Sequence, residues 1–318
     1  MSLTGLLIAM ALPFTTPTYD VKVEKDVPYA TAPGYYTHAP IGDKGSTFKL
    51  LFHSGIPRPV TLEMDIYTPA GDDASARRPL LLMMHGGSFF IGNKGEPGQV
   101  GWGEWFASLG YVAVSIDYRL GFHALKKEIR EAEYRALEDA DAALEYLLGR
   151  EDLRIDGDRV FLCGTSAGAI TALNLAFRLY GKAPMKEVKP RLPGGLRFRA
   201  VANLWGSVHD LSVLENASVP ILSFQSSSDP VMPYEAGYPF QKLSLVMPLF
   251  IDFMYGTHAI YERAREIGLK AEHHPCEETR HRLHLTDDLQ YSPRFFEIRD
   301  AMVRFFAEEM EYIAIFVN

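Results

Sequence analysis

Hydrophobic and polar residues follow two alternating patterns along this chain. Short apolar runs with the length and continuity of buried strands lie at 79–84, 111–117, 159–163, 200–205 and 219–224, and a more polar strand is expected at 270–274. Segments with apolar residues on one helical face lie between and after them, at 103–109, 126–148, 169–180, 257–267 and 293–312. This alternation predicts an α/β fold, with a doubly wound, mostly parallel sheet and helices on both faces.

The amino-terminal part departs from this pattern. Residues 48–52 and 60–67 read as two strands around a turn rich in Pro and Gly, which predicts an antiparallel hairpin. The apolar stretch 3–12 is too short to span a bilayer, and no Lys or Arg precedes it. It is interpreted as an apolar arm packed on the body, with a signal-peptide remnant as the alternative. A cytoplasmic location is therefore favoured, and export is the alternative.

No internal linker is visible, so a single large domain is expected. We predict an N-terminal arm over 1–45, one α/β domain over 46–318, and a cap-like insertion at about 234–256, where Met, Phe and Tyr are frequent. A hydrophobic content of 47% is ample for one buried core.

Charge and cysteine content exclude several functional classes. The 32 basic and 40 acidic residues give a net charge of −8, and the basic residues are scattered, so no nucleic-acid partner is expected. The two cysteines, Cys163 and Cys276, lie far apart at or beside strands, which argues against a disulfide framework. No Cys/His spacing typical of a metal site is present, so neither a metal nor a cofactor is expected. A small neutral or weakly polar ligand fits this composition.

The segment Gly164-Thr165-Ser166-Ala167-Gly168 joins an apolar strand to a helix-like run. A sharp strand-to-helix turn lifts its middle residue out of the sheet, and small residues two before and two after it relieve the crowding. Ser166 is therefore the candidate nucleophile.

A nucleophilic serine needs a base, and the base needs a carboxylate that orients it. Asp229 follows the strand at 219–224 in a loop stiffened by two prolines, and His281 follows the last strand. The chain has ten histidines, and position favours His281 over the nearby His284. The expected order is Ser166, Asp229, His281.

Donors for an oxyanion are expected from the turn His85-Gly86-Gly87-Ser88-Phe89, which follows the strand at 79–84. Residues without side chains let a substrate approach the backbone closely. The backbone N–H groups of Gly87, Ser88 and Ala167 are the predicted oxyanion-hole donors, whereas His85 is assigned a structural role.

Five motifs in this order resemble those of the α/β-hydrolase superfamily: the turn at His85, Asp117-Tyr118-Arg119-Leu120, the segment around Ser166, the loop at Asp229 and the loop at His281. The chain is most similar to bacterial carboxylesterases of the hormone-sensitive-lipase and feruloyl/acetyl-esterase type, over about residues 60–310. Three features depart from that pattern. Ser88 replaces a third glycine, Gln225-Ser226 replaces His-Gly, and arginines flank the base in Arg280-His281-Arg282.

The resemblance implies a serine esterase that cleaves short-chain or aryl acyl esters of small molecules through an acyl-enzyme. Two alternatives remain open: an amidase or peptidase of the arylformamidase-like type, and a catalytically silent binding protein on the same fold. The apolar residues between Tyr234 and Tyr255, with Phe89, Phe90, Trp102 and Trp105, either line the substrate pocket or form a cap or a homodimer contact.

Overall fold

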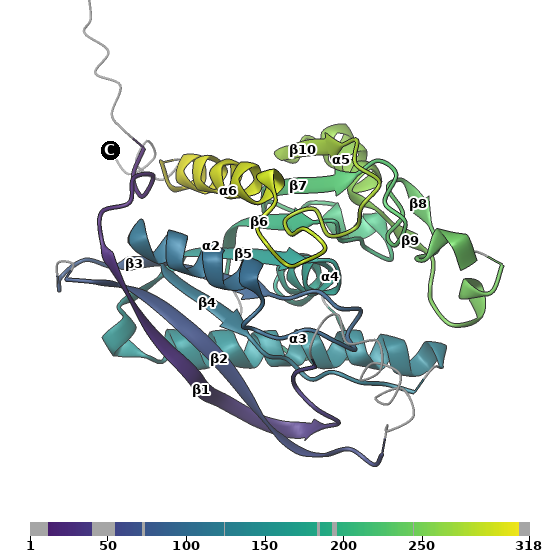
Figure 1. Ribbon diagram of the computed structural model, residues 1–318, viewed down its shortest axis with the longest axis horizontal. Helices are drawn as coiled ribbons and strands as arrows, with labels where there is room; N and C mark the ends of the chain where they lie inside the picture. The colour runs from purple at the N-terminus through teal and green to yellow at the C-terminus, as the bar shows by residue number, and fades with distance from the viewer. Residues whose placement is uncertain are drawn as a thin grey trace, which may run out of the picture.

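The computed structural model describes residues 12–39, 55–71, 74–123, 125–182, 185–192, 196–243 and 245–311. An eight-stranded sheet runs through it in the order β1-β2-β4-β3-β5-β6-β7-β10 (Figure 1). The strands are β1 (Asp20–Gly34), β2 (Arg58–Ala70), β3 (Arg78–Met84), β4 (Val112–Ile116), β5 (Ile155–Thr165), β6 (Phe198–Leu204), β7 (Ile221–Ser226) and β10 (Ala271–Cys276). β1 and β2 pair antiparallel with their neighbours, and all other pairs are parallel. The predicted doubly wound, mostly parallel sheet is confirmed.

Helices cover both faces of this sheet. They are α2 (Pro97–Ser108), α3 (Lys126–Leu148), α4 (Ala167–Leu173), which continues into a π-helical segment at Asn174–Leu179, α5 (Thr257–Glu266) and α6 (Pro293–Glu311). Alternate side chains of β3 enter two different cores. Leu81 packs in the cluster that contains Phe106 of α2 and Phe305 of α6, whereas Leu82 packs with Leu137 of α3. A strand buried on both faces needs a continuous apolar run, which is why β3 was readable from the sequence.

The amino-terminal region differs from the expected arrangement. The strand expected at 48–52 lies outside the described residues. The partner of β2 is instead β1, a segment to which the sequence pattern assigned no strand. β1 is an edge strand whose side chains are mostly exposed or half-buried, so Lys22, Glu24 and Asp26 interrupt its apolar positions. An edge strand needs no continuous apolar run, and its sequence signal is correspondingly weak.

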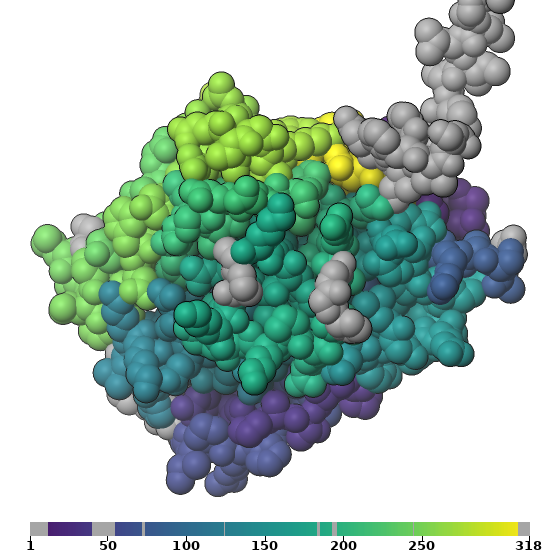
Figure 2. All heavy atoms as spheres, turned by 180° about the vertical axis from the view of Figure 1, so that it is seen from behind, coloured from purple at the N-terminus to yellow at the C-terminus, as the bar shows by residue number. Residues whose placement is uncertain are grey.

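A small second sheet lies in the segment where the cap was expected. Residues 236–255 are called the cap segment below. β8 (Ala236–Gly237) pairs antiparallel with β9 (Met254–Tyr255), and the short 3-10 helices Gln241–Leu243 and Met247–Leu249 lie between them. The segment projects from one end of the molecule, at the right in Figure 1 and at the left in Figure 2. Asp252 ties it to α3 through ion pairs with Lys126 (2.7 Å) and Arg130. No helix in the described ranges is both long and apolar enough to cross a membrane.

Candidate active site

Ser166 lies in a strained turn between β5 and α4. Its backbone has φ 53° and ψ −117°, a region that residues with side chains seldom occupy. The turn is held on both sides, because the Ser166 N–H donates to the Leu204 carbonyl (2.8 Å) and the Ser166 carbonyl accepts from the Ala169 N–H (2.9 Å). A side chain at Gly168 would collide with the Met84 carbonyl of β3. The small residue there lets α4 start directly against the neighbouring strand.

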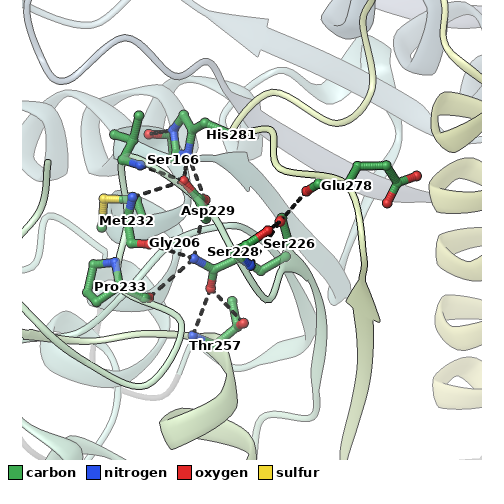
Figure 3. A network of polar contacts seen from close by, with 12 residues as sticks. Ser166, Gly206, Ser226, Ser228, Asp229, Met232, Pro233, Thr257, Glu278 and His281 are labelled. Carbon is green, nitrogen blue, oxygen red and sulfur yellow. Dashed lines mark hydrogen bonds and ion pairs between the residues drawn. The ribbon is translucent and has the colours of Figure 1, made fainter. Parts of the chain in front are cut away.

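The structure brings Ser166, His281 and Asp229 together from three separate segments (Figure 3). His281 Nε2 lies 2.8 Å from Ser166 Oγ, and its Nδ1 lies 2.8 Å from Asp229 Oδ2. The Asp229 side chain is fully buried, whereas 20% of the His281 side chain is exposed. An imidazole that contacts a hydroxyl on one nitrogen and a buried carboxylate on the other can take a proton from the first and be oriented by the second.

His284, the alternative base, lies in a different environment. Its ring stacks on Trp102 and on Trp205, with ring centroids 5.1 and 5.2 Å away. Burial, followed by the positive charge of Arg282, lowers its pKa to about 3. His284 is therefore a neutral packing residue, and the structure records no hydrogen bond from it to Ser166.

The loop that carries Asp229 is held by hydrogen bonds that the sequence did not reveal. Asp229 Oδ1 accepts from the backbone N–H groups of Val231 (2.8 Å) and Met232 (3.1 Å). Gln225 Nε2 donates to Asp229 Oδ2 (3.3 Å), and to the carbonyls of Met232 and Pro233 (both 3.2 Å). Gln225 Oε1 accepts from the N–H and hydroxyl of Thr257. The only sequence signal was the departure of Gln225-Ser226 from the expected His-Gly.

The turn after β3 has the backbone expected of an anion-binding loop. Gly87, Ser88 and Phe89 have φ of 107°, 55° and 58°, and the Gly87 carbonyl accepts from the N–H groups of Phe90 and Ile91 (both 2.9 Å). A side chain on Gly87 would overlap the Ile91 carbonyl. The Gly87 and Ser88 N–H groups form no backbone hydrogen bond with any residue that the structure describes. The N–H of Ala167, the first residue of α4, has no partner within its helix. All three donors are therefore free for a ligand.

The buried His85 contacts this turn and stabilises it. Burial lowers the pKa of His85 to about 4, so its ring is neutral at physiological pH. The ring stacks on Tyr118 at 4.3 Å, and Nδ1 lies 2.7 Å from the Gly86 carbonyl. The Tyr118 hydroxyl donates to the His85 carbonyl (2.7 Å). These contacts fit the structural role that the sequence analysis assigned to His85.

Two cavities meet at Ser166. The larger, of about 510 Å³, is almost wholly apolar. Its lining includes Phe89, Phe122, Ile170 and seven residues of the cap segment, namely Pro239, Phe240, Leu243, Met247, Phe250, Ile251 and Met254. The smaller cavity, of about 300 Å³, is lined by His281 and by the charged residues Glu96 and Arg282. Trp102 and Trp105 line neither cavity: Trp102 packs in the core, and Trp105 lies under the guanidinium of Arg299.

One carboxylate interrupts the apolar cavity. The Glu133 side chain is 3% exposed, and one of its oxygens lies 2.8 Å from His209 Nε2.

Both cysteines are buried and free, and no group of three or more His, Cys, Asp or Glu in the described part of the chain could hold a metal ion.

Comparison with known proteins shows where this fold has been seen. Residues 64–206 match the family model BD-FAE. Among solved structures, butyrate-bound esterase 2 of Thermogutta terrifontis has a TM-score of 0.56 and 18% identity, over 78% of this chain and 90% of that chain. Esterase B of Lactobacillus rhamnosis, inhibited by a tributyrin phosphonate, has a TM-score of 0.56 and 16% identity, over 94% and 90% of the two chains. The overlaps extend to most of each esterase chain, so the fold is shared over most of this chain.

Curated sequences give shorter matches. The non-reducing polyketide synthase ausA of Aspergillus calidoustus is 37% identical over 123 residues, which are 37% of this chain and 5% of that protein. The chain therefore spans only a small part of the length of the curated relatives that it matches.

Proposed function

We propose that this chain, whose fold is that of α/β-hydrolase esterases, is a serine hydrolase that cleaves carboxylic esters through an acyl-enzyme. The observation that carries the proposal is the continuous contact from Ser166 Oγ through the His281 ring to the buried Asp229 carboxylate. Its likeness in fold to bacterial esterases supports the same chemistry.

Each residue has one role in the proposed reaction. Ser166 Oγ attacks the ester carbonyl while His281 Nε2 takes its proton, and Asp229 stabilises the resulting imidazolium. The N–H groups of Gly87, Ser88 and Ala167 bind the oxyanion of the tetrahedral intermediate. The intermediate collapses as the bond from carbon to the alcohol oxygen breaks, and His281 returns the proton to that oxygen. Water then attacks the acyl carbon while His281 Nε2 takes a proton from it. The bond from carbon to Ser166 Oγ breaks, and His281 returns the proton to Oγ.

The apolar cavity is the proposed site for the acyl group, which is a short-chain or aryl acyl. A cavity of about 510 Å³ lined by side chains such as Phe89, Ile170 and Met254 leaves unfilled space around an acetyl group. Butyryl and benzoyl groups would bury more apolar surface there, at about 25 cal/mol per Å². The butyrate bound by esterase 2 of T. terrifontis is consistent with this assignment. We expect p-nitrophenyl butyrate to be a better substrate than the acetate.

The first experiment is hydrolysis of p-nitrophenyl acetate and butyrate by the wild type and by Ser166→Ala. The variant should lose turnover by about 10⁴-fold or more, because no other hydroxyl contacts His281 Nε2 among the described residues. Ser228→Ala, which changes an exposed hydroxyl in the Asp229 loop, is the matched control and should keep wild-type turnover. Turnover that survives in Ser166→Ala refutes the mechanism.

Two further measurements separate the alternatives. Matched butyryl anilides would be cleaved faster than the esters by an amidase, and this result would replace the ester assignment. Labelling with paraoxon tests for a silent fold, because esterase 2 of T. terrifontis is phosphorylated by paraoxon. A reactive serine should give one adduct on the peptide that contains Ser166. No adduct and no turnover on either substrate class would indicate a binding protein.

A further inference from the structure

The two cavities at Ser166 differ in which catalytic group they reach. Both are lined by Ser88 and Ser166, but His281 lines only the smaller one, which is named the polar cavity for its Glu96, His281 and Arg282 although apolar atoms form most of its surface. In the proposed ester hydrolysis, on which this inference rests, His281 must give a proton to the departing alcohol oxygen. The alcohol half of the ester therefore enters the polar cavity, and the acyl half enters the apolar one.

Arg282 lines the polar cavity, and its guanidinium has no partner among the residues that the structure describes. Arg282 is half-buried in the cavity wall, and none of its nitrogens forms a hydrogen bond or an ion pair with a residue of the described segments. Arg280, on the other side of the base, is different: it donates to Asp287 Oδ1 (2.7 Å) and to the Leu285 carbonyl (3.2 Å). Of the two arginines that flank His281, Arg280 is paired with Asp287, and Arg282 lines the cavity assigned to the alcohol.

Glu96 is the one acidic residue in this lining, and it does not neutralise Arg282 fully. Its carboxyl group is deeply buried just before α2, and burial raises the pKa of Glu96 to about 7 against the opposing effects of the Asn93 N–H and then of Arg282. Near neutral pH a large part of Glu96 is protonated. The cavity then presents a net positive charge together with an O–H donor, which suits a singly charged oxyanion.

We propose that Arg282 binds a carboxylate carried by the alcohol half of the substrate, so that the protein prefers esters of small hydroxy acids. A planar guanidinium pairs with a carboxylate through two parallel N–H donors, and this gives both orientation and charge recognition. A dianionic phosphate fits less well, because the ionised fraction of Glu96 repels it more strongly.

The test uses butyryl esters that differ only in the alcohol half: O-butyryl glycolate, its neutral isostere O-butyryl glycolamide, and the dianionic butyryl ester of hydroxymethylphosphonate. The ratio of kcat/KM for glycolate to that for glycolamide should fall by about tenfold or more in Arg282→Gln, mainly through KM. Arg282→Lys should keep part of the preference. Arg280→Gln is the matched control and should leave the ratio unchanged. Because each ratio is compared with the wild-type ratio, intrinsic differences between the leaving groups cancel.

Hydrolysis of p-nitrophenyl butyrate separates the two possible failures. A wild type that does not cleave this ester refutes the proposed function. If it is cleaved and the glycolate-to-glycolamide ratio does not change in Arg282→Gln, the esterase assignment stands and the carboxylate site is refuted. A larger loss for the phosphonate ester than for the glycolate ester would overturn the choice of carboxylate.

Discussion

At the scale of single residues, the roles at this site divide into those set by local sequence and those set by tertiary contact. Ser166 was predictable because small residues around a strand-to-helix turn are a local requirement. Asp229 and His281 were predictable in position, because in a parallel sheet the strands end at one edge. Gln225 was not, because its partners lie on its own loop and on α5 and are brought together only by folding.

Gln225 gives a prediction at this scale. Its amide makes hydrogen bonds from a fully buried position, so Gln225→Leu would leave the Met232 and Pro233 carbonyls and the Thr257 N–H without that partner. We expect a loss of about 2–4 kcal/mol in the free energy of unfolding. We also expect a clear fall in kcat with little change in KM, because the Asp229 carboxylate loses part of its anchoring while the acyl cavity is unchanged.

Urea unfolding and ester kinetics on the same preparation test this expectation. Ser228→Ala serves again as the control, because Ser228 is exposed and its hydroxyl contacts only the hydroxyls of Ser226 and Thr279. Equal losses of kcat in both variants, or wild-type stability in Gln225→Leu, would show that the amide does not position the acid.

At the scale of elements, the ends of helices place charge near the site. α4 begins directly after Ser166, and α2 begins directly after its N-cap Glu96, which lines the polar cavity. The sequence placed the start of α4 two residues late, at 169 instead of 167, and the start of α2 six residues late, at 103 instead of 97. The sequence did not indicate that Glu96 is buried. Its neighbours Gly95 and Pro97 indicate only a turn, and the loop around His281, which lines the same cavity, lies about 185 residues further along the chain.

Glu96 makes stability depend on pH. Its pKa is about 7 in the folded protein and about 4.5 in a solvated chain, so the folded state holds this proton over a range in which the unfolded state has lost it. The stability that the protonated group contributes is complete below about pH 4.5 and is lost as the pH rises through 7. Glu96→Gln has no such loss. Its unfolding free energy should rise relative to wild type between pH 5 and pH 8, by up to about 3 kcal/mol.

Denaturant unfolding at several pH values checks the sign. Glu104→Gln, on the exposed side of the same helix, is the matched control for removing one carboxyl group from α2. A constant difference for Glu96→Gln would mean that the buried carboxyl group does not titrate in this range.

At the scale of the whole molecule, the cap segment is attached to the sheet domain at few points. β8 and β9 pair Gly237 with Met254, so the chain leaves and re-enters the body at one place. Its inward side chains line the apolar cavity, whereas Leu245 and Leu249 are 95% and 72% exposed. The sequence could not decide between a pocket wall and a contact surface, since apolar residues of one short segment serve both. A homodimer contact through the outward residues stays a prediction.

This arrangement predicts that the cap can be removed without unfolding the protein. Replacing residues 239–252 by an Asn-Gly turn would continue the β8–β9 hairpin with a two-residue loop. The ion pairs of Asp252 with Lys126 and Arg130 would be lost, and partly exposed pairs contribute about 0–1 kcal/mol each. Thermal unfolding should remain cooperative with a midpoint near that of the wild type. The preference for p-nitrophenyl butyrate over acetate should fall towards one, because the outer wall of the acyl cavity is gone while Ser166, His281 and Asp229 remain.

Leu245→Ser, which changes only an outward side chain, should keep both the midpoint and the preference. A shortened protein that unfolds at a much lower temperature would place the segment in the folding core, and one that keeps its butyrate preference would place the acyl group elsewhere.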